Sequence, residues 1–273
     1  MKKFEGMLIC TDLDGTLLRN DKTISQENLD AIEYFKSEGG LFTFITGRLP
    51  CFSGKICEAI RPNAPFGCIN GGGIYDYYKK EYLWQLELDP SAIELAEYVN
   101  DKVENMGVQL NAFETVYFCT ENEAMVNFRR RTGLPNIQKQ MREVDEPLCK
   151  IIFVTNEPEK ITRAAELLRE HPKGDMFDYI HSEAHIYEIL PKGSGKGSLL
   201  TRMAGILDVD MKKTVAIGDF YNDVSMIDAA GVGVAVANAV DEAKAVADYV
   251  TVSNEDHAVA RVISDIEKGI IKV

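Results

Sequence analysis

Short apolar runs alternate with helical patterns along most of the chain. The first run predicts a strand over residues 7–12, and Ser25 is then placed to cap a helix that ends at Gly39. Later runs predict strands at residues 41–46, 66–70, 214–219 and 231–236, with helices from about residue 196, after residue 223 and from about residue 256. This alternation is typical of βα units around a mostly parallel sheet.

The regular alternation of strands and helices changes in the middle of the chain. After Asp89-Pro90 we expect a helix that ends at Gly107, followed by strand-like pieces that alternate with two more helical stretches. Residues 190–197, "LPKGSGKG", have the Pro- and Gly-rich composition of a domain linker. The fold class predicted is therefore α/β, with a Rossmann-like, doubly wound core and an inserted α+β domain. The expected boundaries are 1–85 for the first part of the core, 86–189 for the insert and 190–273 for the second part of the core.

The overall charge restricts the possible partners. The 273 residues include 30 Lys and Arg against 43 Asp and Glu, a formal charge of -13. Such a chain repels phosphate backbones and anionic lipid, so nucleic acid and membranes are not expected partners. The N-terminus lacks the apolar core of a signal peptide, and the six cysteines include no C-x-x-C pair. We therefore expect a cytoplasmic protein, and the sequence does not indicate an oligomeric state.

Three of the predicted strands end in polar residues flanked by glycine: Asp12-Leu13-Asp14-Gly15-Thr16, Thr46-Gly47-Arg48 and Gly218-Asp219-Phe220-Tyr221-Asn222-Asp223. In open α/β sheets the ligand crevice lies beyond the carboxyl ends of the strands. We therefore expect four carboxylates to meet there, those of Asp12, Asp14, Asp219 and Asp223. Because these carboxylates would repel one another, we expect a bound divalent cation to offset the repulsion. Ligands that are all oxygens favour Mg²⁺.

A carboxylate beside such a cation suggests phosphoryl transfer. Asp12 would attack phosphorus to give an aspartyl-phosphate, which water then hydrolyses. Asp14 would protonate the leaving oxygen and later deprotonate the water. The phosphoryl group needs prearranged donors, for which the candidates are Thr46, the neighbouring amide of Gly47, Lys196 and Asn222, with Arg48 a little further out.

These segments resemble a known family. "DLDGT", "TGR", the lysine of "GKG" and "GDFYND" occur in the order and approximate spacing of the four motifs of the haloacid dehalogenase-like hydrolase superfamily. The insertion between the second and third motifs, with "NGGGI" and "AVANAVDEAK", resembles the Cof-type branch of sugar-phosphate phosphatases. The resemblance covers nearly the whole chain.

The resemblance implies a role for each matching residue. It makes Asp12 the nucleophile and Asp14 the acid/base, which also binds Mg²⁺ through its backbone carbonyl. It places Thr46 and Lys196 on the phosphate and Asp219 on the metal, with Asp223 as a further ligand or directly behind one. It also implies that the insert is a cap which closes over the site and selects the substrate.

Three other features bear on the interpretation. Many relatives have a small residue directly after the Asp of the fourth motif, whereas this chain has Phe220-Tyr221, whose rings would narrow the pocket or supply a stacking surface. "GSGKGS" is not a P-loop, because Leu190 stands where the pattern needs glycine and Gly197 where it needs Ser or Thr. His181 and His185 lack the order of a zinc-binding helix and are interpreted as solvated or capping residues.

The sequence thus predicts a Mg²⁺-dependent phosphatase of a small phosphorylated metabolite, a sugar phosphate or a phosphorylated cofactor. A phosphomutase, which passes the phosphoryl group to a second hydroxyl, stays open as an alternative. A signalling or binding module that is merely phosphorylated on Asp12 is less favoured, because such a module has no need of Asp14 as acid/base.

Overall fold

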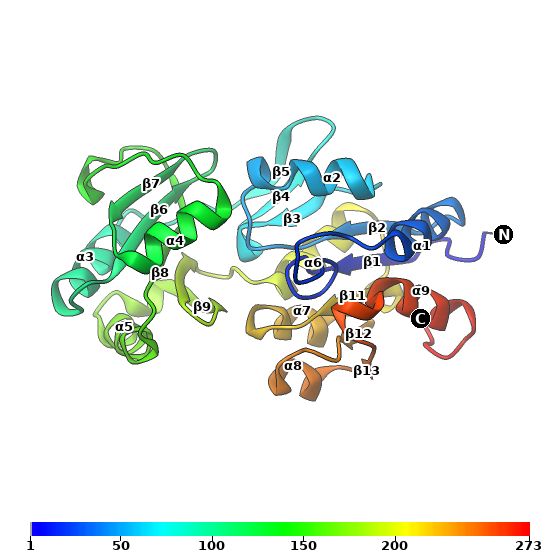
Figure 1. Cartoon of the computed structure of the whole chain (residues 1–273). Coiled ribbons are helices and arrows are strands. Elements are labelled where there is room, and N and C mark those ends of the chain that lie inside the picture. Colours follow the sequence, from blue (N-terminus) through cyan, green and yellow to red (C-terminus); the bar gives the residue numbers. More distant parts are fainter. Residues whose placement is uncertain (1) are drawn as a thin grey trace. The chain divides into compact units, whose positions relative to one another are not determined.

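The computed structural model of the protein describes residues 2–273 (Figure 1). The chain divides into two compact units. One consists of Met1–Gln85 and Gly195–Val273, and the other of Leu86–Ser194.

The first unit is built on a five-stranded sheet in the order β13-β12-β11-β1-β2, in which every neighbouring pair is parallel. The strands are β1 (Leu8–Thr11), β2 (Leu41–Phe44), β11 (Thr214–Gly218), β12 (Val232–Ala235) and β13 (Tyr249–Val250). All four residues of β1 are buried, because a central parallel strand is covered on both faces. This explains why β1 reads as a continuous apolar run, and the predicted α/β class with a mostly parallel sheet is confirmed.

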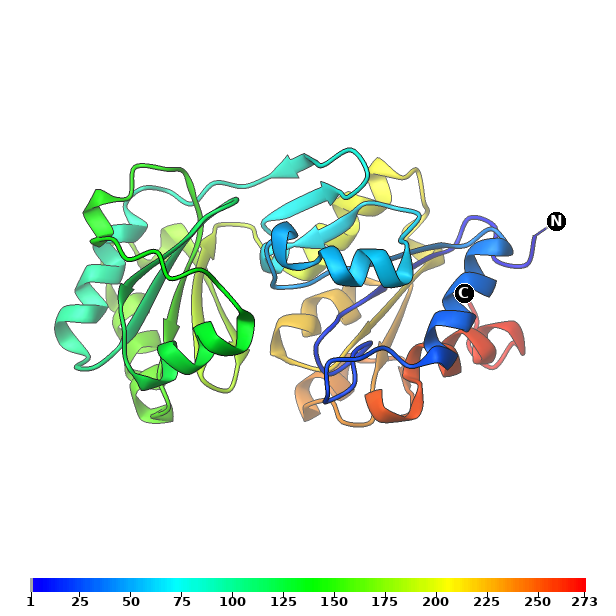
Figure 2. The same cartoon turned by 45° about the horizontal axis from the view of Figure 1, so that its top comes forward.

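Helices cover this sheet. They are α1 (Gln26–Ser37), α2 (Gly54–Ile60), α6 (Lys196–Ile206), α7 (Val224–Ala229), α8 (Asp241–Val246) and α9 (Ala258–Glu267). Ser25 caps α1 as expected, since its hydroxyl accepts the Asn28 N–H at 3.3 Å. Leu8 and Cys10 of β1 pack with Leu199 of α6. On α1 and α9, which lie side by side in Figure 2, the apolar faces pack together.

Residues 66–85 differ from the prediction. The expected strand 66–70 ends at Cys68 and belongs to a separate antiparallel sheet of β3 (Phe66–Cys68), β4 (Gly73–Asp76) and β5 (Glu81–Gln85). The chain reverses at Ile69–Gly71, where three successive residues have positive φ, so it cannot continue the βα rhythm. A parallel bridge between Ile45 and Gly67 joins this sheet to the end of β2.

The second unit has an antiparallel sheet in the order β7-β6-β8-β10-β9. Its strands are β6 (Gly107–Ala112), β7 (Val116–Thr120), β8 (Leu148–Val154), β9 (Phe177–Glu183) and β10 (Ile186–Pro191), and its helices are α3 (Ala92–Lys102), α4 (Glu123–Thr132) and α5 (Pro158–Glu170). Leu95 of α3 and Leu168 of α5 share a core with Ile151 of β8. The helix predicted to reach Gly107 ends at Lys102, because Val103 already has extended backbone, and the left-handed Asn105 follows before β6 begins.

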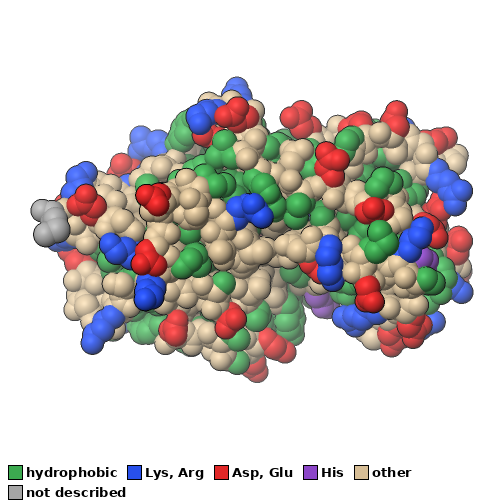
Figure 3. Space-filling model, turned by 180° about the vertical axis from the view of Figure 1, so that it is seen from behind, with side chains coloured by type: hydrophobic (Ala, Val, Ile, Leu, Met, Phe, Trp, Pro, Cys, Tyr) green, Lys and Arg blue, Asp and Glu red, His purple; other side chains and the backbone are tan. Residues whose placement is uncertain are grey.

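Residues 2–273 also contain seven short 3₁₀ turns: Pro50–Phe52, Ile69–Gly71, Met141–Glu143, Gly174–Met176, Met211–Lys213, Tyr221–Asp223 and Asn254–Asp256. Acidic and basic side chains are interspersed on the face shown in Figure 3. Within residues 2–273, no helix has the length and apolar character needed to cross a membrane.

Candidate active site

Three aspartates meet where β1 and β11 end. Asp12 directly follows β1, and its backbone N–H donates to the carbonyl of Ile217 in β11 at 2.8 Å. Asp219 directly follows β11, and Asp223 ends the next 3₁₀ turn. Since β1 and β11 are parallel neighbours, their carboxyl ends lie together, and one carboxylate oxygen from each of the three aspartates lies within 4.8 Å of the others.

Lys196, the first residue of α6, is fully buried against this aspartate cluster. Its Nζ donates to Oδ1 of Asp12 and to Oδ1 of Asp223, each at 2.5 Å. Burial lowers the pKa of Lys196, but the charges of Asp12 and Asp223 outweigh burial and raise that pKa above its usual value. The ammonium therefore stays charged, and full ionisation of the three carboxylates would leave two negative charges unbalanced.

The carboxylates respond to this excess of negative charge. Burial raises the pKa of Asp12 well above its usual range, and although Lys196 lowers it, Asp223 and Asp219 raise it further. Burial, together with the charge of Asp223, raises the pKa of Asp219 to about 7. Carboxylates that resist ionisation in this way are stabilised by a bound cation, and oxygen ligands suit a hard divalent one. The residues present therefore fit a divalent metal.

The loop after β1 is shaped around Asp219. The hydroxyl of Thr16 donates to Oδ1 of Asp219 at 2.6 Å. Gly15 has φ +87°, and a Cβ there would lie 2.5 Å from Oδ2 of Asp219, so the close approach requires glycine. Asp223 also shapes its own loop, because its Oδ2 accepts the backbone N–H groups of Asp219 at 2.9 Å and Phe220 at 3.0 Å.

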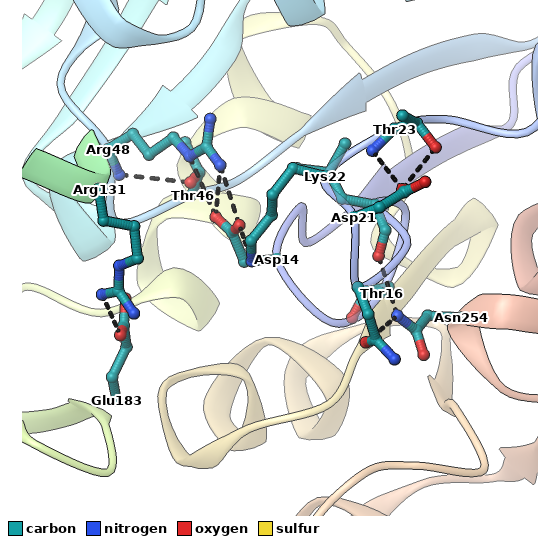
Figure 4. Close-up of polar contacts among 12 residues, drawn as sticks. Asp14, Thr16, Asp21, Lys22, Thr23, Thr46, Arg48, Arg131, Glu183 and Asn254 are labelled. Atoms are coloured by element: carbon teal, nitrogen blue, oxygen red, sulfur yellow. Dashed lines mark hydrogen bonds and ion pairs between the residues drawn. The ribbon is translucent and has the colours of Figure 1, made fainter. Parts of the chain in front are cut away.

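The carboxylate of Asp14 is not part of the aspartate cluster. It accepts from Nε of Arg48 at 3.0 Å and from Nζ of Lys22 at 2.9 Å (Figure 4). Burial raises the pKa of Asp14, but Arg48 and Lys22 together outweigh it, so that pKa lies below its usual value. Four carboxylates were expected to meet, and the structure brings three of them together. The fourth, that of Asp14, is paired instead with Arg48 and Lys22.

Lys22 was not among the residues predicted for the site. It lies eight positions after Asp14, and its backbone has φ 66°. The positive charge is visible in the sequence, but the left-handed turn that brings it back to Asp14 is not. Arg48, which was predicted, reaches Asp14 from the loop after β2.

The remaining predicted residues lie on two neighbouring loops. Thr46 accepts the backbone N–H of Arg48 on its hydroxyl at 3.3 Å. Asn222 donates from Nδ2 to Oδ1 of Asn70 at 3.1 Å, and the N–H of Asn70 donates to the carbonyl of Thr46 at 3.1 Å. Gly47 lies against the amide of Asn70. Asn70 was missed as a site residue, and its one sequence signal is an Asn-Gly pair after an apolar run.

The two rings of the fourth motif lie beside this cluster in the chain. Phe220 and Tyr221 form an edge-to-face pair with centroids 4.9 Å apart. Tyr221 is 41% exposed, so its ring is accessible.

A parallel α/β sheet that gathers aspartates and a buried lysine at the ends of its strands is the arrangement expected of a phosphoryl-transfer enzyme. Residues 9–263 match the family described as haloacid dehalogenase-like hydrolase. The chain belongs to the haloacid dehalogenase-like hydrolase family, and the resemblance predicted from its motifs, including the Cof-type branch, is confirmed.

Individual relatives agree with this membership. The 5-amino-6-(5-phospho-D-ribitylamino)uracil phosphatase YwtE of Bacillus subtilis is 30% identical, over 96% of this chain and 98% of its own length. The pyridoxal phosphate phosphatase YbhA of Escherichia coli is 27% identical, over 94% and 97%. A solved haloacid dehalogenase-like hydrolase from B. subtilis superimposes with a TM-score of 0.83 at 25% identity, over 99% of this chain and all of that one. The enzyme class is that of a phosphatase.

Proposed function

We propose that the protein is a Mg²⁺-dependent phosphatase that hydrolyses a small phosphorylated metabolite through an aspartyl-phosphate on Asp12. One observation carries the proposal. The buried cluster gathers the carboxylates of Asp12, Asp219 and Asp223 around one ammonium, that of Lys196, so the cluster with all three carboxylates ionised has two negative charges that Lys196 does not balance. A dication would balance them and leave the Asp12 carboxylate ionised for attack.

The metal would be held by Asp12, Asp219 and the backbone carbonyl of Asp14, with Asp223 as a ligand or directly behind one. When bound, Mg²⁺ supplies positive charge to the phosphoryl oxygens. Lys196 orients Asp12 through the 2.5 Å contact. The proposed donors to the phosphoryl group are Thr46, the Gly47 amide, Arg48, Lys196 and Asn222.

The reaction proceeds in two displacements. A carboxylate oxygen of Asp12 bonds to phosphorus while the bond to the leaving oxygen breaks, and Asp14 gives that oxygen its proton. Water then attacks phosphorus, Asp14 takes the proton from the water, and the Asp12 carboxylate leaves as inorganic phosphate forms. In the structure Arg48 and Lys22 pair with Asp14 and keep its pKa low, which favours the ionised form. To act as the acid, Asp14 must therefore leave these two cations, turn toward the phosphoryl group and take up a proton there.

The substrate is proposed to be a sugar phosphate or a phosphorylated cofactor. The names of two relatives support this class, since one acts on a phosphoribityl compound and the other on pyridoxal phosphate. The insert, predicted over residues 86–189, would act as the cap that selects among such substrates. Phe220 and Tyr221 would offer a stacking surface for a flat ring. A cytoplasmic location is proposed as well, and Cys10, Cys57 and Cys149, which are buried and outside any disulfide, support it.

Removing divalent metal tests the proposal directly. After dialysis against EDTA, phosphate release from a panel of phosphorylated sugars and cofactors should fall to background, because the buried carboxylates then repel the substrate phosphate. Added Mg²⁺ should restore it. The measurement is inorganic phosphate released, and a hexose 1-phosphate in the panel reports a mutase if it yields the 6-phosphate instead. Release that is equally fast in EDTA would contradict the metal requirement.

Replacing Asp14→Asn separates a phosphatase from a module that is merely phosphorylated. We expect kcat to fall by about 10²–10⁴-fold, the usual contribution of general acid–base catalysis, while circular dichroism shows a retained fold. Asp21→Asn is the matched control, because Asp21 lies in the same loop, is exposed and bonds only within it, to Thr23. Unchanged turnover in Asp14→Asn would remove Asp14 from the mechanism.

A further inference from the structure

The turn at Ile69–Gly71, which we call the 69–71 turn, has an unusual backbone. Ile69 has φ 58° and Asn70 has φ 50°, and both side chains are fully buried. Left-handed backbone is unfavourable for any residue with a Cβ, and a β-branched isoleucine there is an outlier. Such strain persists only where the surrounding structure fixes it, and it concentrates at functional sites.

The 69–71 turn contacts three of the segments that carry candidate site residues: the loop after β2, the loop after β11 and the start of α6. The N–H groups of Ile69 and Asn70 donate to the carbonyls of Arg48 and Thr46, each at 3.1 Å. Oδ1 of Asn70 accepts from Asn222 on the loop after β11. On the third side, a Cβ added to Gly71 would lie 2.2 Å from the backbone nitrogen of Gly195, which directly precedes Lys196.

The amide of Asn70 lies between two of these loops. A Cβ added to Gly47 would lie 2.8 Å from its Oδ1 and 2.9 Å from its Nδ2, so Gly47 must be glycine for the amide to fit. Nδ2 of Asn70 is buried and has no hydrogen-bond acceptor anywhere in residues 2–273. A buried donor without a partner lowers stability. Asparagine tolerates the left-handed backbone better than most residues with a Cβ, but glycine adopts it without strain and would leave no unpartnered donor. The backbone conformation alone therefore does not explain why an asparagine amide is buried here.

We propose that Asn70 is a positioning residue that fixes the Thr46–Arg48 loop and Asn222 at the spacing a phosphoryl group requires. This role rests on the proposed phosphatase function. The side-chain amide of Asn70 accepts a hydrogen bond from Asn222 on one side and packs against Gly47 on the other. The backbone N–H of Asn70 donates to the carbonyl of Thr46. Without the amide, nothing fixes the distance between the donors on the two loops. A misplacement of about 1 Å at such a site lowers turnover by about 100-fold.

The variant that tests this is Asn70→Gly. The substitution removes the whole side chain, the amide together with Cβ, and glycine adopts the left-handed backbone without strain. With p-nitrophenyl phosphate and Mg²⁺, we expect kcat to fall by about 100-fold, with a smaller change in KM and a melting temperature equal to or above that of the wild type. Asn105→Gly is the matched control, the same substitution at an exposed left-handed residue (φ 60°) of the other unit. It should keep wild-type kcat.

A second measurement separates positioning from packing. Asn222→Ala and Asn70→Gly remove two ends of one hydrogen bond, so the double variant should lose much less than the product of the two single losses. Losses that multiply, or that follow the melting temperature, would overturn the positioning role. So would a kcat of Asn70→Gly within twofold of an active wild type, and that result leaves the phosphatase function intact. A wild type that releases phosphate from no compound refutes the proposed function, and the role of Asn70 with it.

Discussion

Asp12→Asn should abolish phosphate release, with a loss of at least about 10⁴-fold, as for other nucleophiles of covalent catalysis. The amide is a far weaker nucleophile than the carboxylate, so no aspartyl-phosphate forms. The variant should still fold, because Lys196 keeps its 2.5 Å contact with Asp223 and the buried ammonium is not left without a charged partner. The measurements are phosphate release and covalent labelling of the protein by ³²P-labelled acetyl phosphate.

Asp228→Asn is the control for that experiment. It makes the same chemical change at an exposed position of α7 and should leave both release and labelling unchanged. Labelling that persists in Asp12→Asn would show that another residue is the nucleophile.

Lys196→Met should have the largest effect on stability. The substitution leaves the carboxylates of Asp12, Asp219 and Asp223 buried together without their cation. Removing one partner of a buried ion pair typically costs about 3–5 kcal/mol, so the free energy of unfolding in EDTA should fall by about that amount. Since full ionisation of the cluster would then leave three unbalanced negative charges and not two, added Mg²⁺ should stabilise this variant more than the wild type. Urea denaturation with and without Mg²⁺ measures both effects.

Lys79→Met serves as the comparison for Lys196→Met. Lys79 belongs to the same unit, but it is exposed and its ion pair with Asp76 spans 3.4 Å. Surface pairs contribute about 0–1 kcal/mol, so its unfolding curve should almost overlie that of the wild type. If Lys196→Met behaves in the same way in EDTA, the electrostatic account of the aspartate cluster is wrong.

The strands that carry the candidate site could be predicted from the sequence, because each is marked by a run of neighbouring apolar residues. β1 is a continuous apolar run that stops at Asp12, and β11 is another that stops at Asp219. A strand buried on both faces needs apolar residues at every position, and a parallel sheet aligns the carboxyl ends of its strands. Those two rules bring Asp12 and Asp219 to the same edge of the sheet.

Other features of the site could not be predicted from the sequence, because they depend on tertiary contacts. The sequence does not show that Asp14 pairs with Arg48 and Lys22, which lie 34 and eight residues away. It does not show the 69–71 turn either, since a β-branched isoleucine disfavours the left-handed backbone that Ile69 adopts there. In both places, long-range contacts outweigh the local preference.

By itself, then, the sequence determined the α/β class, the strand ends and the family, because hydrophobic periodicity and short motifs are properties of neighbouring residues. Only the tertiary structure decided that Asp12, Asp219 and Asp223 share one buried space while Asp14 pairs with cations. It also decided that Asn70 contacts both the loop after β2 and the loop after β11. Those outcomes depend on distances of a few ångströms between residues far apart in the chain, where burial strengthens each charge–charge interaction.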